Sequence, residues 1–316
     1  MKLFELYKKN NGKELVRYYH HYGLLGSAFF WGGLLHGSKI EQEQFREIMS
    51  YKIQKKFHKK YFRRNVAIDG PMIGNDNTAL FGEKIIWVAW FQGMESAPEL
   101  VKLNYNRLIN NTNETVILIT KDNIENYVKL PQIIFNKWYA GAIPNTHFSD
   151  IVRAQLLTVY GGVWLDSTVV MLGRLPSYFS DEFFMYQSLK PGKNALVLPF
   201  SNWALASKAN NVLIKRTRDL LLQYWIDNDK PHEYFIFHRM MKIVMAEYPE
   251  KASRITPIDN SQPHAVLVSS KNMELTEKEI ANMFDFSPIH KLSYKVETPF
   301  QKENNKKIFN WLSNHK

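Results

Sequence analysis

Apolar positions near the N-terminus follow a helical spacing. The stretch at 46–64 reads REIMSYKIQKKFHKKYFRR, and its apolar residues recur every four positions, at Met49, Ile53, Phe57 and Tyr61. That spacing places them on one face of an α-helix. We therefore expect residues 1–65 to form a helical region, followed by a Gly- and Pro-containing linker at 66–82.

From residue 83 onward, apolar runs alternate with helical patterns. The runs at 84–90 (KIIWVAW) and 115–120 (TVILIT) are typical of buried strands, with a helix between them. Strand, helix and strand in this length form a parallel βαβ unit. Residues 83–316 are therefore predicted to be an α/β domain. Such sheets bind ligands beyond the carboxyl ends of their strands, which makes Trp90 and Gln92 candidate ligand contacts, although Trp90 also fits a core position.

A second strand end carries a carboxylate. A helix is predicted at 150–160 with Ser149 as its N-cap, and Gly161-Gly162 ends it. A short apolar strand then leads directly into Asp166. This carboxylate leaves the sheet at the ligand-binding edge, where it is placed for a sugar or for a divalent cation that neutralises a diphosphate. Capping of the strand end is the alternative interpretation.

The charge of the chain indicates a possible binding partner, an anionic membrane. The 316 residues carry a formal net charge of +11 and no cysteine, which excludes disulfides and thiolate metal sites. The basic side chains are densest at 46–64, and a basic amphipathic helix is typical of a membrane surface, with a solvated face as the alternative. The apolar run at 22–35 is too short to span a bilayer and fits a buried helix or an interfacial segment. We expect residues 20–64 to contact an anionic membrane.

Three short blocks of sequence resemble a known group of enzymes. Asp150 and Arg153 are three residues apart and share a helix face, which fits a surface ion pair or a pair that binds sugar and phosphate. They lie in FSDIVRAQLLTVYGGVWLDSTV, which resembles the SD-x-x-R and YGG-x-x-x-D pattern of glycosyltransferase family 32 and the related capsular polysaccharide synthesis proteins. WVAWFQG at 87–93 and PIHKLSYK at 288–295 resemble other blocks of these proteins.

The resemblance implies a GT-A-like domain with a mixed, mainly parallel sheet, a UDP-linked donor, and transfer with retention of configuration. By position, Trp90 would flank the uracil, Asp150 and Arg153 would hold the donor sugar, and Asp166 would be the first aspartate of a DXD motif. Asp166, Asp150 and Arg153 are the residues expected to act in catalysis. The residues expected to bind the donor are Trp90, Gln92, Asp150, Arg153, Gly162, Asp166, Asn202, Lys291 and Lys295.

The resemblance also implies a divalent cation, Mn²⁺ or Mg²⁺. Its ligands would be Asp166 and His290, with Lys291 or Lys295 supplying further charge for the phosphates. The sequence departs from the DXD pattern because Thr168 replaces the second carboxylate. A hydroxyl is a poor ligand for these cations, so His290 carries more of the metal hypothesis. A structural role is the alternative for a lone histidine.

These features predict a retaining glycosyltransferase. It would transfer galactose or glucose from a UDP-sugar to a lipid-diphosphate-linked oligosaccharide, at the cytoplasmic face of the cell membrane, in capsular or surface polysaccharide synthesis. One alternative is a metal-dependent nucleotidyltransferase, but FQGMESAPEL after the first strand contains no Gly-rich phosphate loop. The other is a nucleic-acid-binding protein. Its basic residues should extend across the α/β domain, whereas they are densest at 46–64, so no nucleic-acid partner is expected.

Overall fold

The computed structural model describes residues 38–66, 80, 84–190 and 196–315. Its strands are β1 (Ile85–Ala89), β2 (Thr115–Ile119), β3 (Gly162–Leu165), β4 (Val169–Met171), β5 (Phe183–Gln187), β6 (Phe200–Ser207) and β7 (Ile289–Lys291). Its α-helices are α3 (Lys39–Tyr61), α4 (Glu99–Asn111), α5 (Ile124–Tyr127), α6 (Gln132–Tyr139), α7 (Asn145–Val159), α8 (Val212–Asp227), α9 (Ile236–Glu247), α10 (Pro249–Ala252), α11 (Ser261–Asn272), α12 (Glu277–Phe284) and α13 (Pro299–Asn314). Two short 3-10 helices are η2 (Met94–Ser96) and η3 (Ser177–Ser180).

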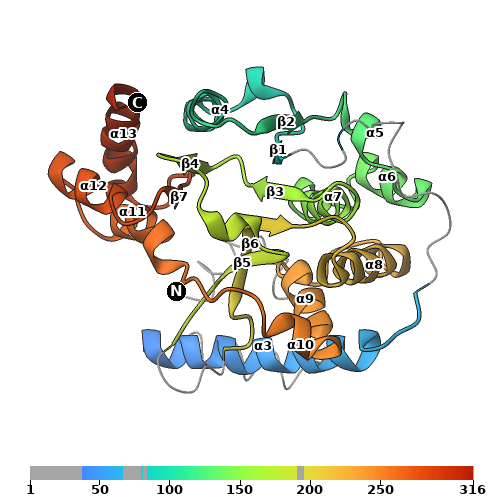
Figure 1. The fold of residues 1–316 in the computed structure, drawn as a ribbon. Helices are drawn as coiled ribbons and strands as arrows, with labels where there is room; N and C mark the ends of the chain where they lie inside the picture. Colours follow the sequence, from blue (N-terminus) through green and yellow to red (C-terminus); the bar gives the residue numbers. More distant parts are fainter. Residues whose placement is uncertain (1–37, 67–79, 81–83, 191–195, 316) are drawn as a thin grey trace.

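A five-stranded sheet in the order β2-β1-β3-β6-β5 forms the centre of the fold (Figure 1). Strand β1 is parallel to β2 and to β3, and β6 is antiparallel to both of its neighbours. Within this sheet β6 therefore runs against the other strands, which confirms the prediction of an α/β domain with a mixed, mainly parallel sheet. Strands β4 and β7 pair antiparallel in a separate small sheet.

Helices cover both faces of the central sheet, as the alternation of side chains along β1 requires. Ile85 and Trp87 belong to a cluster that also contains the buried side chains of α7 and α8. Ile86 and Val88 belong to the cluster on the other face, which includes Leu108 of α4. A third cluster joins α11, α12 and α13 to the outer face of the small sheet. Figure 1 shows α7 and α8 on one side of the central sheet and α11 to α13 on the other.

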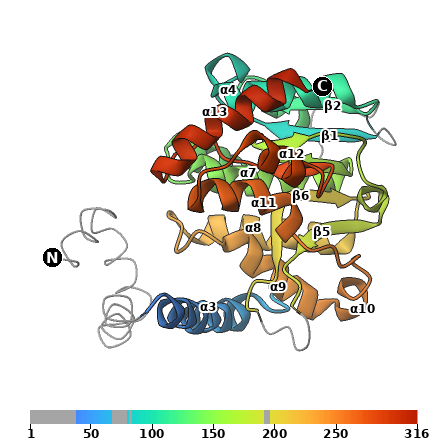
Figure 2. The same cartoon turned by 90° about the vertical axis from the view of Figure 1, so that its left-hand side faces the viewer.

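Helix α3 packs against the domain through its apolar stripe. Met49, Ile53, Phe57 and Tyr61 are all buried. The Phe57 ring stacks on Tyr224 of α8, with centroids 6.0 Å apart. Figure 2 shows α3 at the opposite end of the molecule from α4 and α13. The stripe predicted for this helix is confirmed, but it packs against the protein itself. Only the basic face of α3 therefore remains available for contact with a membrane.

Parts of the N-terminal prediction lie outside the described residues. These parts are residues 1–37, which include the apolar run at 22–35, and most of the linker expected at 66–82. Among the described helices, none combines the length and apolar character that crossing a bilayer requires.

Candidate functional site

A cavity of about 600 Å³ opens beyond the carboxyl ends of β1 and β3. This is where an α/β sheet binds ligands. Eight of the residues expected at the site line the cavity, and these are Trp90, Gln92, Asp150, Arg153, Asp166, Asn202, Lys291 and Lys295. Gly162 and His290 are not among its lining residues.

The turn before β3 explains the place of Gly162. Gly161 and Gly162 have φ angles of +73° and +91°, a region that favours glycine. A Cβ on Gly162 would lie 2.5 Å from the carbonyl oxygen of Ile85, so the missing side chain lets β3 lie against β1. Gly162 begins the strand and Asp166 follows its end. Gly162 thus shapes the strand that carries Asp166, and its expected contact with the donor stays a prediction.

Helix α7 supplies the next part of the site. It begins at Asn145, so Ser149 lies within the helix and is not the N-cap predicted from the sequence. The Ser149 Oγ accepts a hydrogen bond of 3.1 Å from Nη2 of Arg153, one helical turn later. The start predicted at residue 150, which rested on Ser149 as the N-cap, was therefore too late.

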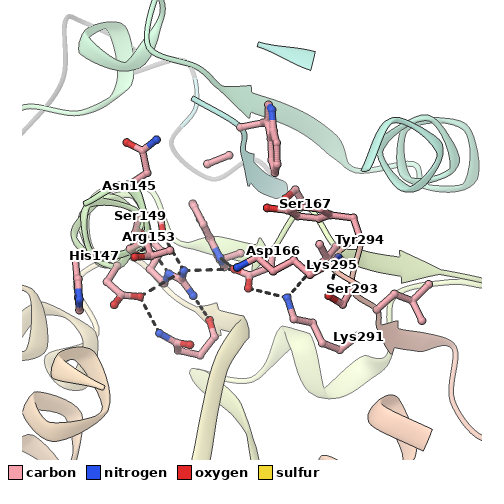
Figure 3. Close-up of a pocket in the computed structure, with 18 of the residues that line it drawn as sticks. Asn145, His147, Ser149, Arg153, Asp166, Ser167, Lys291, Ser293, Tyr294 and Lys295 are labelled. Atoms are coloured by element: carbon pink, nitrogen blue, oxygen red, sulfur yellow. Dashed lines mark hydrogen bonds and ion pairs between the residues drawn. The ribbon is translucent and has the colours of Figure 1, made fainter. Parts of the chain in front are cut away.

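The Arg153 guanidinium lies between two carboxylates. Its Nη2 is 3.4 Å from Oδ1 of Asp150 and 3.3 Å from Oδ1 of Asp166. Its Cζ lies 4.8 Å from the centroid of the Trp164 ring, in cation–π geometry. Asn202 joins the cluster from β6. Its side-chain amide donates to Asp150 Oδ1 (2.8 Å), and its backbone carbonyl accepts from Arg153. Figure 3 shows this network on one side of the cavity.

The two carboxylates differ in charge state. Burial raises the pKa of Asp150 to about 7, an effect that the negative charge of Asp166 increases and that Arg153 opposes. Burial would also raise the pKa of Asp166. However, Lys291, Arg153 and a hydrogen bond from Trp164 together hold the pKa of that carboxyl below its usual value. Asp166 is therefore ionised at neutral pH, whereas Asp150 titrates there.

Strand β7 brings Lys291, and not His290, to Asp166. Neighbouring side chains of a strand point to opposite faces. Lys291 Nζ lies 3.0 Å from Asp166 Oδ2 and 2.5 Å from Thr168 Oγ1 (Figure 3). His290 is completely buried, and its Nε2 lies 2.6 Å from the Ser287 carbonyl oxygen and 3.0 Å from that of Phe284. In this structure the side chain beside Asp166 is therefore that of Lys291, the neighbour of the expected His290.

Several further residues line the cavity. Tyr294 meets Trp90 edge to face, with ring centroids 5.8 Å apart, at one side of the cavity. Tyr234 and His238 also line it. Burial lowers the pKa of His238 to about 3, so its ring is neutral. Tyr294 lies in the C-terminal block PIHKLSYK, three residues after Lys291. On a continued strand it would share a face with His290, so the strand pattern does not indicate its place at the cavity.

The chain matches a known family over most of its length. The model of the capsular polysaccharide synthesis proteins matches residues 35–312. The chain belongs to this family. The matched region includes all three sequence blocks and all the residues that form the cavity.

Over the aligned residues, the curated relatives are about one quarter identical to the chain. It is 27% identical over 165 residues to O-glycosyltransferase PaGT of Phomopsis amygdali, which is 46% of this chain and 39% of that protein. It is 24% identical over 163 residues to O-glycosyltransferase braB of Annulohypoxylon truncatum, 45% and 38% of the two chains. The chain thus spans about two fifths of the length of these relatives.

A solved structure, PaToxG Glycosyltransferase, is similar to the chain with a TM-score of 0.38 and 14% identity. The similarity covers 84% of this chain and 96% of that one. A similarity at this level supports no inference about fold or activity.

The donor set around Asp166 does not fit the divalent cation that the resemblance implies. Mn²⁺ and Mg²⁺ bind oxygen ligands, usually one or two carboxylates and the phosphates of a substrate. Both oxygens of Asp166 already face positive or N–H donors, from Trp164 and Arg153 at Oδ1 and from Lys291 at Oδ2. Nowhere in the described ranges do three or more His, Cys, Asp or Glu side chains gather so that they could hold a metal ion by themselves. A cation at Oδ2 would have to displace the Lys291 ammonium.

Proposed function

We propose that the chain is a retaining glycosyltransferase that uses a UDP-linked hexose, galactose or glucose, as its donor. The observation that supports this most directly is the buried Arg153 shared by Asp150 and Asp166 at the ligand-binding edge of the sheet. The same residues lie in the block that resembles glycosyltransferases. The curated relatives, which are named as glycosyltransferases, support the same reaction class.

The lining of the cavity suits each part of a nucleotide sugar. Carboxylates such as Asp150 accept hydrogen bonds from sugar hydroxyls. The cations that line the cavity, Arg153, Lys271, Lys291 and Lys295, outnumber its two carboxylates, which favours a ligand with a diphosphate. The aromatic pair of Trp90 and Tyr294 offers flat apolar surfaces for the uracil ring.

In the proposed reaction, the bond between the anomeric carbon and the β-phosphate oxygen breaks, and its electron pair stays on that oxygen. A bond forms between the anomeric carbon and the acceptor hydroxyl oxygen. The acceptor proton passes to the departing phosphate oxygen, so UDP is released without a separate protein base. Within this scheme the protein binds and orients the donor, and it stabilises the charge of the leaving diphosphate.

The acceptor proposed is a lipid-diphosphate-linked oligosaccharide at the cytoplasmic face of the membrane, in capsular or surface polysaccharide synthesis. Support comes from α3, whose outer face carries exposed lysines at 52, 55, 56 and 59. Each basic residue near an anionic surface contributes about 1 kcal/mol to binding. Replacement of these four lysines by glutamine should weaken sedimentation with anionic liposomes and spare neutral ones. Equal binding of both proteins to anionic liposomes would contradict the proposed contact.

A donor screen tests the enzymatic proposal. The purified chain is incubated with UDP- and GDP-sugars, with and without Mn²⁺, and the released nucleotide is measured. We expect turnover of a UDP-hexose. Asp166→Asn should lose nearly all of it while remaining folded, because its amide nitrogen would face the Lys291 ammonium in place of a carboxylate oxygen. Absence of turnover and binding for every donor would refute the proposal, and full activity of Asp166→Asn would refute the site.

A further inference from the structure

We propose that Lys291, oriented by Thr168, takes the place of a divalent cation in this site by binding the diphosphate of the donor. The proposal rests on the glycosyl transfer proposed above and adds the group that neutralises the leaving UDP. Its consequence is that donor binding and turnover need no added metal.

The position of the ammonium group supports this assignment. Lys291 Nζ lies 3.0 Å from Asp166 Oδ2 and 2.5 Å from Thr168 Oγ1, and all three side chains line the cavity. An ammonium has three N–H donors. Two of them are accounted for by these acceptors from the described part of the chain, which leaves one for a phosphate oxygen. The Lys291 side chain is only 18% exposed, and partial removal from water strengthens its attraction to an anion.

Because Thr168 carries no charge, the positive charge of Lys291 remains available to a bound anion. A second carboxylate two residues after Asp166 would neutralise the ammonium and favour a metal ion. The Thr168 hydroxyl accepts a hydrogen bond from Lys291 but carries no charge. The departure from the DXD pattern and the nearness of the lysine are therefore two parts of one arrangement, in which the protein itself supplies the cation.

The charge change in the reaction identifies what Lys291 would do. When the anomeric carbon leaves the β-phosphate oxygen, the electron pair remains on that oxygen and the diphosphate gains negative charge. The Lys291 N–H donates to the diphosphate and retains its proton throughout, while the acceptor proton passes to the departing oxygen. Arg153 lies on the other side of Asp166, so the anion would have a cationic group at either side (Figure 3).

The test compares binding of UDP and of uridine by calorimetry, with the full chain, first in excess EDTA and then in Mn²⁺. Wild-type affinity for UDP should be the same in both, within about threefold. Lys291→Met should weaken UDP binding by about tenfold to a hundredfold, the effect expected of one charge-assisted hydrogen bond. It should leave uridine binding unchanged, because uridine carries no phosphate. Lys306→Met, at an exposed lysine paired with Glu303, is the matched control and should bind UDP as the wild type does.

A second pair of variants keeps the proposal testable if Lys291→Met fails to fold. Thr168→Ser retains the hydroxyl and should bind UDP like the wild type, whereas Thr168→Val removes the acceptor and should weaken UDP binding severalfold. UDP binding by the wild type that vanishes in EDTA would overturn the proposal and leave glycosyl transfer standing. So would a folded Lys291→Met protein with wild-type affinity for UDP. If the wild type binds no nucleoside diphosphate in either buffer, the glycosyltransferase proposal itself fails.

Discussion

The raised pKa of Asp150 predicts that replacing this residue stabilises the protein in alkaline buffer. Asp150→Asn keeps the contacts of Oδ1, because an amide oxygen accepts from the Asn202 amide and faces Arg153 as the carboxylate does. What it removes is the cost of ionising a buried carboxyl group. The side chain of Asp150 is only 11% exposed, so this cost is large.

The size of the effect follows from the pKa. In the folded protein the pKa is about 7, against an ordinary value of 3.8. Each unit of pKa difference is worth ~1.4 kcal/mol, so ionisation of Asp150 costs the folded state up to ~4 kcal/mol. Because the folded pKa is raised, the stability due to the protonated group is fully present below pH 3.8. It is lost as the pH rises through about 7.

Chemical denaturation across this range measures the effect. The free energy of unfolding of Asp150→Asn should exceed that of the wild type at about pH 8.5 by up to ~4 kcal/mol, and the difference should shrink steadily toward about pH 5. If sugar hydroxyls bind the ionised form, donor turnover of the wild type should rise through neutral pH, and the variant should lack this rise. A difference in unfolding free energy that does not change with pH would refute the reasoning. So would a variant less stable than the wild type at about pH 8.5.

Three further substitutions test the packing around the site. Gly162→Ala should destabilise the fold by several kcal/mol in thermal melting, because its Cβ would collide with the Ile85 carbonyl at a positive φ; a wild-type melting temperature would contradict this. Arg239→Met should cost about 3–5 kcal/mol in urea unfolding, since it leaves the buried Glu233 carboxylate without its partner; Arg239→Lys should restore part of the loss. His290→Leu should cost about 1–3 kcal/mol, because it leaves two buried carbonyl oxygens without their donor. Its UDP affinity should be unchanged. A loss of affinity that Mn²⁺ restores would instead indicate that His290 takes part in donor binding.

Local sequence patterns predicted most of the central elements. The strand-helix-strand unit from β1 to β2 could be recognised because its apolar runs and its intervening helix are continuous in the chain. The pairing of β6 between β3 and β5 could not, because antiparallel insertion depends on contacts between segments far apart in sequence. The short strands β4 and β7 were also missed, since three residues carry too little periodicity to distinguish a strand from a loop.

Contacts between distant segments also limited how much of the site could be predicted from the sequence. Asp150, Arg153 and Asp166 come from one continuous block, and the helix and strand that carry them bring them together. Lys291 comes from β7, and its face depends on the register of that strand against β4, where Lys291 lies opposite Val169. A shift of one residue in register moves every side chain to the other face. The sequence alone therefore could not choose between Lys291 and its neighbour.

Helix α3 shows a different limit. An apolar stripe beside basic residues has the same pattern whether the stripe faces a membrane or another helix. Here the stripe is buried: the Gln54 amide donates to the carbonyl oxygen of Arg239, and Arg239 donates to the carbonyl oxygen of Ser50. These contacts join residues almost two hundred positions apart, and no local pattern indicates them.

The two carboxylates beside Arg153 are distinguished by their other neighbours. The guanidinium lies at nearly equal distances from Asp150 and Asp166, so it does not by itself separate their pKa values. Lys291 and Trp164 both donate to Asp166, whereas Asp150 receives a neutral amide donor. Asp166 is thereby kept ionised as a fixed partner for the cations, and Asp150 is the carboxyl group that gains or loses a proton near neutral pH. Two carboxyl groups held at different pKa values can take separate roles in one site. The role that changes with pH therefore belongs to Asp150, and the role that holds Lys291 in place belongs to Asp166.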